Sequence, residues 1–160
     1  MKQKKIIGIT GGVGAGKSSV LAVLKNDFGA KIILADLVAH DLMEPGSLGL
    51  RKVTEALGTS FLTPDGAVDR KALADLIFRD KEALKTMNSI IHPLVWKTMK
   101  EEAEAASENL VIIEAAVFDT APKNFFDELW YVYTTKENRI VRLMENRGYS
   151  HEKCEDIIGR

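Results

Sequence analysis

The sequence has little cysteine, little net charge and no long apolar run. One cysteine, Cys154, in 160 residues excludes a disulfide framework and suits a reducing compartment. A formal net charge of −1 gives no overall basic field, so we predict no nucleic-acid partner. No apolar run approaches the ~18 residues of a membrane span, and the run after the basic start is too short for a signal peptide. We therefore expect a soluble, cytoplasmic protein that has no membrane partner.

What the sequence does contain is enough apolar material for a core. Apolar residues make up 46% of the chain, and its length suggests one domain with inserted subregions. Four short apolar runs predict strands at residues 5–10, 31–35, 110–113 and 129–133. Helical patterns lie between them, which predicts an α/β fold with a doubly wound parallel sheet. The long helical stretch between the second and third strands exceeds an ordinary connector, so we expect it to cover a substrate.

A glycine-rich stretch, ITGGVGAGKSSV, follows the first predicted strand. It fits the pattern G-x-x-x-x-G-K-[ST], with Gly11, Gly16, Lys17 and Ser18 in the fixed places. A helical pattern follows and stops at Gly29, so the loop has the strand before it and the helix after it that the motif requires. This context predicts a phosphate-binding loop of the P-loop NTPase type.

Each residue type in this loop has a chemical reason. Glycines allow a tight turn with inward-facing N–H groups, and a helix N-terminus favours an anion. Lys17 is placed to reach the β- and γ-phosphates, and Ser18 to ligate Mg²⁺. The dinucleotide pattern G-x-G-x-x-G does not fit, because Lys17 or Ser19 stands where it needs glycine. The alternative is an ordinary glycine turn before a helix.

Two carboxylates are expected at the ends of predicted strands, where ligands bind in open α/β sheets. Asp36 follows the second strand and could approach Mg²⁺ or an acceptor hydroxyl; alternatively it is only the N-cap of a helix that begins at Leu37. Glu114 ends the third strand and faces the same edge. The sequence alone leaves function and structure equally open for Glu114.

Basic residues form two further groups. Three arginines follow the fourth strand: Arg139, Arg142 and Arg147, of which the first two share a helix face. All three could form a mobile lid that clamps the transferring phosphate. Alternatively, they are solvated surface residues. His40, Arg70 and His92 fall in or beside the helical insertion. Considered singly, each has a plainer role. His40 could face solvent, Arg70 could form a surface ion pair with Asp69 or Asp75, and His92 could shape a turn before Pro93.

Taken together, the motifs resemble those of the dephospho-coenzyme A kinase family along the whole chain. The similar stretches, in order, are GITGGVGAGKSSV, ADLVAHDLMEPG, DGAVDRKALADLIF, IIHPLV, VIIEAAVF and RIVRLMENRGYSHEKCEDII. The loop alone occurs in many kinases and other nucleotide-binding proteins, but the ordered set is far more specific. The resemblance implies an enzyme that uses ATP and Mg²⁺ to phosphorylate the ribose 3′-hydroxyl of dephospho-coenzyme A, the last step of coenzyme A synthesis.

The resemblance also implies roles for particular residues and regions. The catalytic residues would be Lys17, Asp36 and Arg142, with Asp36 as the base. The metal would be bound by Ser18 and Asp36. The substrate side would carry His40, Arg70, His92 and Glu114. The residues that bind ATP would be Gly11, Gly12, Val13, Gly14, Ala15, Gly16, Lys17, Ser18, Ser19 and Arg147. The implied regions are a nucleotide core at residues 1–36 and 108–135, a substrate-binding insertion at 37–107, and a lid with a following helix at 136–160.

Two departures from the family accompany this reading. Leu34 stands where many members carry the first aspartate of Asp-Ala-Asp, so Asp36 would act alone. Members usually continue beyond residue 160, so a fifth strand and backbone contacts to adenine are expected to be missing. We expect a monomer with weak self-association through the open sheet edge. The alternatives are another small-molecule kinase, such as a nucleoside monophosphate kinase, and a nucleotide-binding module without turnover; a GTPase is disfavoured because N-K-x-D is absent.

Overall fold

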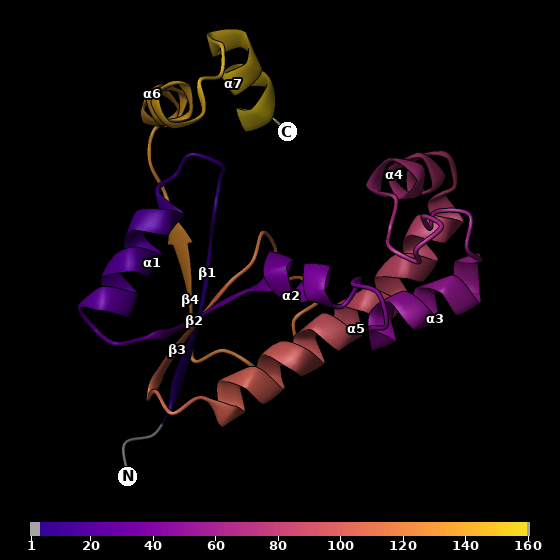
Figure 1. Cartoon of the computed structure of the whole chain (residues 1–160). Helices are drawn as coiled ribbons and strands as arrows, with labels where there is room; N and C mark the ends of the chain where they lie inside the picture. The colour runs from indigo at the N-terminus through magenta and orange to yellow at the C-terminus, as the bar shows by residue number, and fades with distance from the viewer. Residues whose placement is uncertain (1–3, 160) are drawn as a thin grey trace. The chain divides into compact units, whose positions relative to one another are not determined.

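The structure, a computed structural model, describes residues 4–159; the outermost ends of the predicted core and lid regions, residues 1–3 and 160, lie outside it. The chain divides into two compact units. The sheet unit comprises the chain up to Ile33 together with the part from Ala105 onward, and the helical unit is Leu34–Glu104. Figure 1 shows the elements of both.

The sheet unit is built on four strands in the order β2-β3-β1-β4. They are β1 (Lys5–Gly11), β2 (Lys31–Leu34), β3 (Leu110–Glu114) and β4 (Glu128–Val132). β1 runs parallel to both β3 and β4, with Ile9 opposite Glu114 and Gly11 opposite Val132. The predicted strands and the parallel α/β fold are confirmed. Because the strands are parallel, the carboxyl ends of β1, β3 and β4 meet at one edge.

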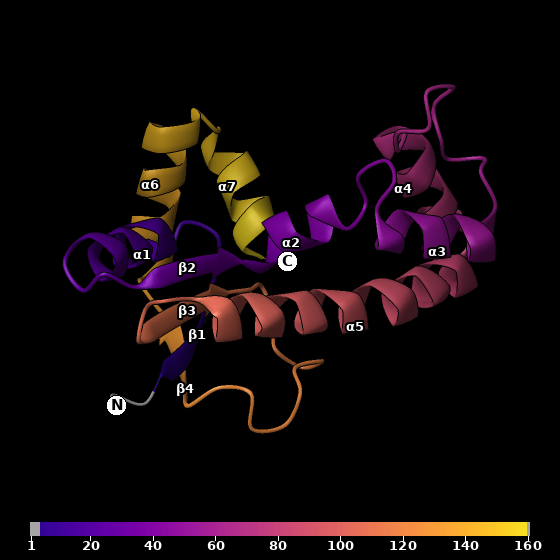
Figure 2. The same ribbon diagram turned by 60° about the horizontal axis from the view of Figure 1, so that its bottom comes forward.

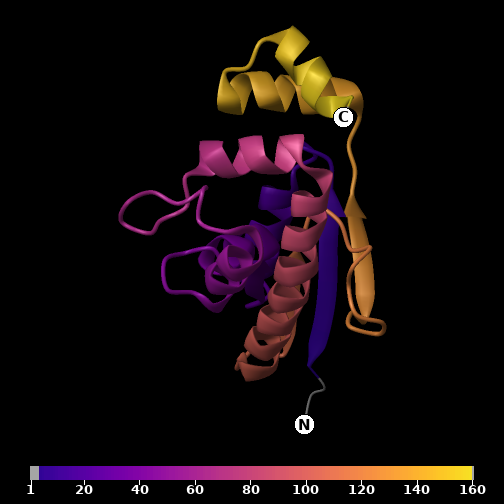
Figure 3. The same ribbon diagram turned by 90° about the vertical axis from the view of Figure 1, so that its right-hand side faces the viewer.

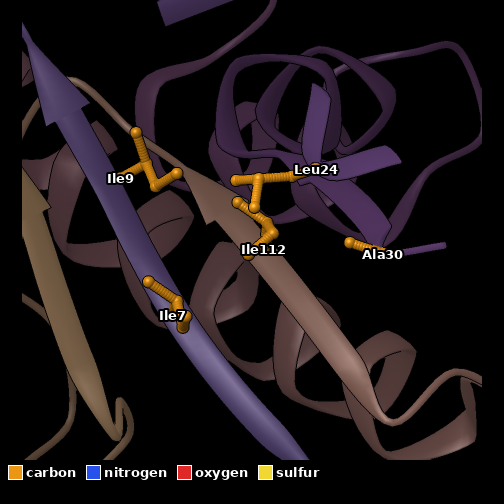
Figure 4. Close-up of a cluster of buried hydrophobic side chains, with 5 residues drawn as sticks. All are labelled: Ile7, Ile9, Leu24, Ala30 and Ile112. Atoms are coloured by element: carbon orange, nitrogen blue, oxygen red, sulfur yellow. The ribbon is translucent and has the colours of Figure 1, made fainter. Parts of the chain in front are cut away.

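The core of the sheet unit lies between the strands and α1 (Lys17–Asn26). Ile7 and Ile9 of β1 pack with Ile112 of β3, Leu24 of α1 and Ala30, as Figure 4 shows. Ile9 and Ile112 are fully buried. Strands buried on both faces need such continuous β-branched runs, which is why their sequence pattern was recognisable. The packing fixes α1, and with it the loop that precedes α1, against the end of β1.

Two helices complete the sheet unit after β4. α6 (Lys136–Arg147) and α7 (His151–Ile158) are each capped by a hydroxyl, from Thr135 and Ser150 respectively. They pack against each other around Ile140, Leu143 and the buried Cys154. Figure 3 shows this pair, in yellow, beyond the carboxyl end of β4. Cys154 is therefore a core residue of the helix pair.

The helical unit contains four helices: α2 (Ala35–Asp41), α3 (Leu48–Leu57), α4 (Arg70–Arg79) and α5 (Lys81–Ala105). Ser47 caps α3 by accepting a hydrogen bond from the Leu50 N–H, and Asp69 caps α4 by accepting from Lys71 and Ala72. Between α3 and α4 the chain forms a short antiparallel bridge from Leu62 to Val68. Phe61, at the start of that turn, is completely buried.

Two predictions about the helical unit were wrong. Asp36 does not end a strand and is not an N-cap: β2 ends at Leu34, which is itself the extended N-cap residue, and α2 begins at Ala35. Asp36 thus lies in the first turn of α2, where the helix dipole favours a carboxylate. The good helix former Ala35 extends the helix two residues further back than Leu37.

The second wrong prediction concerns the turn before Pro93, which was the plainer of the two roles considered for His92. Instead α5 is one helix of 25 residues with Pro93 inside it, and Figure 2 shows it unbroken. Proline removes one backbone hydrogen bond from a helix interior. The apolar face of α5 offsets this loss, because Ile91, Val95, Trp96 and Met99 on either side of the proline are all buried.

Candidate phosphate-binding and acceptor sites

The glycine-rich loop joins the end of β1 to the start of α1. Gly14 and Gly16 have left-handed φ values of 77° and 99°, which side chains other than glycine rarely adopt. Gly16 is the N-cap of α1, and Lys17 and Ser18 are its first residues. The first N–H groups of a helix have no partner in a preceding turn, which favours an anion at this end. In α1 the Ser19 N–H already donates to the Gly16 carbonyl oxygen at 3.1 Å.

Lys17 lies beside the loop and beside the end of β3. Its Nζ donates to the Gly11 carbonyl oxygen at 2.6 Å and lies 4.0 Å from the Glu114 Oε1 atom. Both side chains are about one-fifth exposed. The parallel register explains this proximity, because Glu114 is paired with Ile9, two residues before the loop begins. The ammonium group is therefore held at the loop by an acceptor and by a carboxylate that the sequence had placed at this edge.

Helix α6 contacts the loop through two arginines. Arg139 Nε donates to the Val13 carbonyl oxygen at 2.7 Å, and Arg142 Nη1 donates to the Ala15 carbonyl oxygen at 2.9 Å. Arg142 was predicted as a lid residue, and it lies at the loop. Arg147, also predicted, is the exposed last residue of α6. Arg139 was considered with Arg142 and Arg147 as a possible lid arginine on the basis of its spacing, but the family resemblance gave it no role of its own.

A separate cavity lies within the helical unit. Its volume is about 330 Å³, within the usual range for small-molecule sites. Three predicted site residues line it together: the catalytic candidate Asp36 and the substrate-side candidates His40 and Arg70. The other lining residues are Ala39, Met43, Glu44, Pro45, Ala67, Val68 and Leu73. His92 is not among them; it lies half-buried on α5.

The cavity carries groups of both charges. His40 Nδ1 lies 3.3 Å from the Glu44 Oε1 atom and 3.7 Å from the Asp41 Oδ1 atom, so a protonated His40 would be paired with two carboxylates. Arg70 is exposed at the start of α4. Apolar walls with a few polar groups suit a ligand that has both phosphate and hydrophobic parts. Glu44 and the cavity walls fall within the family-like stretches ADLVAHDLMEPG and DGAVDRKALADLIF, but sequence reasoning gave them no role.

The described residues hold no preformed metal cage. Among residues 4–159, no three His, Cys, Asp or Glu side chains gather in a way that could bind a metal ion. The Ser18 hydroxyl, which was predicted to ligate Mg²⁺, is exposed at the start of α1. No helix in the described part of the chain is long and apolar enough to cross a membrane.

A loop of this sequence, between a buried parallel strand and a helix with lysine and serine at its start, defines a P-loop protein of the kinase type. Kinases of this type use ATP. The family model described as Dephospho-CoA kinase matches residues 5–160. The chain belongs to the dephospho-CoA kinase family.

Individual relatives agree with this assignment. The chain is 41% identical over 158 residues to the Dephospho-CoA kinase of Moorella thermoacetica, covering 96% of this chain and 74% of that protein. It is 35% identical over 153 residues to the Dephospho-CoA kinase of Carboxydothermus hydrogenoformans, covering 93% and 74%. Among solved structures, TT1252 from Thermus thermophilus superposes with a TM-score of 0.75 at 30% identity, covering 98% of this chain and 79% of that one. The family predicted from the motifs is thus confirmed.

Proposed function

We propose that this chain transfers the γ-phosphoryl group of ATP to the ribose 3′-hydroxyl of dephospho-coenzyme A, giving coenzyme A and ADP. The observation that carries the proposal is a correctly formed phosphate loop in a chain that matches the dephospho-CoA kinase model over residues 5–160. The reaction forms a bond between the acceptor oxygen and the γ-phosphorus and breaks the bond from that phosphorus to the bridging β,γ-oxygen. The acceptor hydroxyl gives up one proton.

The loop residues are proposed to hold the triphosphate. The phosphoryl transition state is loose, with charge on the equatorial oxygens, so catalysis depends mainly on position and charge. The N–H groups at residues 11–19 and the Lys17 ammonium would bind the β- and γ-oxygens. Mg²⁺, held by Ser18, would neutralise charge on the same oxygens when bound. Arg142 would add a positive charge at the transferring group, and Arg147 would bind ATP from the end of α6.

The helical unit is proposed to hold the acceptor. Asp36 is proposed to take the proton from the 3′-hydroxyl, since a carboxylate is a suitable general base. His40 and Arg70, which line the same cavity as Asp36, would bind acceptor phosphates, and the apolar walls would contact the pantetheine arm. His92 and Glu114 remain predicted substrate-side residues, and Asp36 a predicted metal-facing one. The regions predicted as core, insertion and lid keep those proposed roles.

The test is ADP formation from ATP and Mg²⁺ with and without dephospho-coenzyme A, with coenzyme A identified as product by mass. We expect ADP formation to depend on this acceptor. Adenosine and nucleoside monophosphates serve as competing acceptors, and their faster phosphorylation would contradict the proposal. Tight ATP binding without transfer to any acceptor would identify a nucleotide-binding module instead. A monomeric state and a cytoplasmic location belong to the same proposal and can be checked by sedimentation and by fractionation.

A further inference from the structure

Arg139 contacts the phosphate loop differently from the other arginines of α6. Its Nε atom, close to the helix, donates to the Val13 carbonyl oxygen at 2.7 Å. Its side chain is half-buried, whereas Arg142 and Arg147 are exposed. We propose that Arg139 is a positioning residue that holds the tip of the phosphate loop in its ATP-binding shape. This inference rests on the proposed function for its reaction, but its test can be read without any acceptor.

The peptide that Arg139 holds joins Val13 to a glycine with a left-handed backbone conformation. The Val13 carbonyl and the Gly14 N–H belong to one planar peptide and point in opposite directions. Gly14 has a left-handed φ of 77°, and a glycine can leave this conformation at little cost. Fixing the Val13 carbonyl outward toward Arg139 therefore fixes the Gly14 N–H on the opposite side, toward the inside of the loop. The donor is charged, which strengthens the bond.

Two glycines leave room for this contact. A Cβ at Gly12 would come within 2.5 Å of Arg139 Nη2 and 2.7 Å of its Cζ, so the guanidinium lies directly over the bare Cα. A Cβ at Gly14 would lie 3.1 Å from both the Arg139 carbonyl oxygen and Leu143 Cγ. Gly12 does not have a positive φ, so its conformation alone does not require glycine. The close approach of Arg139 supplies a reason.

Arg142 contacts the loop through a different part of its guanidinium group. It uses Nη1, at the far end of a long exposed side chain, and that atom lies 2.9 Å from the Ala15 carbonyl oxygen and 3.5 Å from that of Gly14. Such a group can leave the carbonyls and move to a phosphate with little rearrangement. Arg139 bonds through Nε, which precedes the guanidinium carbon, so releasing this bond would move the whole guanidinium group. Loss of Arg139 should therefore lower nucleotide affinity, and loss of Arg142 should lower turnover.

Two near-isosteric substitutions test the role of the hydrogen bond. Glutamine carries an N–H group four atoms from Cα, where arginine carries Nε, while methionine carries a methyl group there. We expect Arg139→Met to weaken binding of the ATP analogue AMP-PNP with Mg²⁺ about tenfold, the order expected for a lost charged hydrogen bond. Arg139→Gln should restore affinity to within about threefold of the parent. Arg79→Met, a charge-matched change at an exposed residue of α4, should bind like the parent.

A double-mutant cycle with Gly12 completes the experiment. Gly12→Ala should displace the guanidinium and weaken AMP-PNP binding by a similar factor, and combining it with Arg139→Met should add little, because both remove one contact. Calorimetry gives the affinities, and circular dichroism melts exclude global unfolding. Three results would each overturn the proposal. Arg139→Met could bind AMP-PNP as tightly as the parent, Arg139→Gln could fail to restore the affinity lost in Arg139→Met, or the effects of Arg139→Met and Gly12→Ala could be fully additive. AMP-PNP binding without phosphorylation of dephospho-coenzyme A would contradict only the proposed function, whereas a parent chain that binds no nucleotide would contradict both.

Discussion

The two units of this chain present their ligand-facing groups in different ways. In the sheet unit, the loop between β1 and α1 offers mainly backbone N–H groups, whose directions are set by glycines at fixed positions. In the helical unit, the cavity offers side chains from α2, α4 and the segments between helices. A backbone site constrains the sequence tightly, whereas a side-chain site can be built in many ways. The phosphate-binding function is therefore more strongly encoded than the choice of acceptor.

The largest effect should follow from removing the charge beside the loop. Lys17→Ala takes away the ammonium group that lies 2.6 Å from the Gly11 carbonyl oxygen. We expect turnover to fall ~10²-fold or more, as for other lost transition-state stabilisers. The fold should survive, because Lys17 is partly exposed. Steady-state kinetics with a thermal melt checks this, and parental turnover would show that the loop is not catalytic.

The next effect concerns the carboxylate of the helical unit. Asp36→Asn keeps the size of the side chain in the first turn of α2 but removes its charge. We expect turnover to drop by ~10²-fold, the scale of general base catalysis, with little change in the affinity for ATP. Single-turnover rates and ATP titration separate the two quantities. Unchanged turnover would leave Asp36 with only a helix-dipole role.

A smaller and more selective effect is expected at the cavity. Arg70 and Arg79 are the first and last residues of the same helix, α4, but only Arg70 lines the cavity. Arg70→Ala should raise the KM for dephospho-coenzyme A roughly tenfold, since a charged hydrogen bond to a phosphate is lost, and leave the KM for ATP unchanged. Arg79→Ala is the matched control. If both variants had the same KM for dephospho-coenzyme A, the acceptor would not bind through Arg70 in this cavity.

The smallest effect is one of pH on the α6–α7 pair. Lys136 Nζ donates to Glu155 Oε1 at 2.9 Å, and this contact lowers the pKa of the Glu155 carboxyl. A carboxyl whose pKa is depressed by folding contributes stability above its unfolded pKa and loses it as the pH falls through the folded value. The Tm difference between the parent and Glu155→Gln should therefore be small at neutral pH and vanish in acid. A difference that persists at low pH would point to packing rather than charge.

The sequence predicted the sheet unit better than the helical unit, for physical reasons. The strands were recognisable because β-branched residues such as Ile7, Ile9 and Ile112 must fill a buried parallel sheet. The loop was recognisable because the left-handed φ values at Gly14 and Gly16 demand glycine.

The helical unit could not be predicted as well, because its outcome depended on packing. The helix through Pro93 persists because of buried neighbours along α5, which local propensity does not reveal. The start of α2 at Ala35 likewise defied the expectation that Asp36 would mark a boundary. His40 and Arg70 were each weak candidates when considered singly, whereas Asp36 was already favoured by its place after the second predicted strand. Only the cavity that they line together distinguishes them from His92.

The chain's two tryptophans are divided between the units, and this gives each unit its own optical signal. Trp96, on α5, is 7% exposed, whereas Trp130, on β4, is 38% exposed and donates to Glu128 at 2.7 Å. The buried indole should emit at shorter wavelength and resist acrylamide quenching, and the exposed one should emit further to the red. Trp96→Phe would leave Trp130 to report the unfolding of the sheet unit. Trp130→Phe would leave Trp96 to report the unfolding of the helical unit. Fluorescence could then establish whether the two units unfold as one cooperative body.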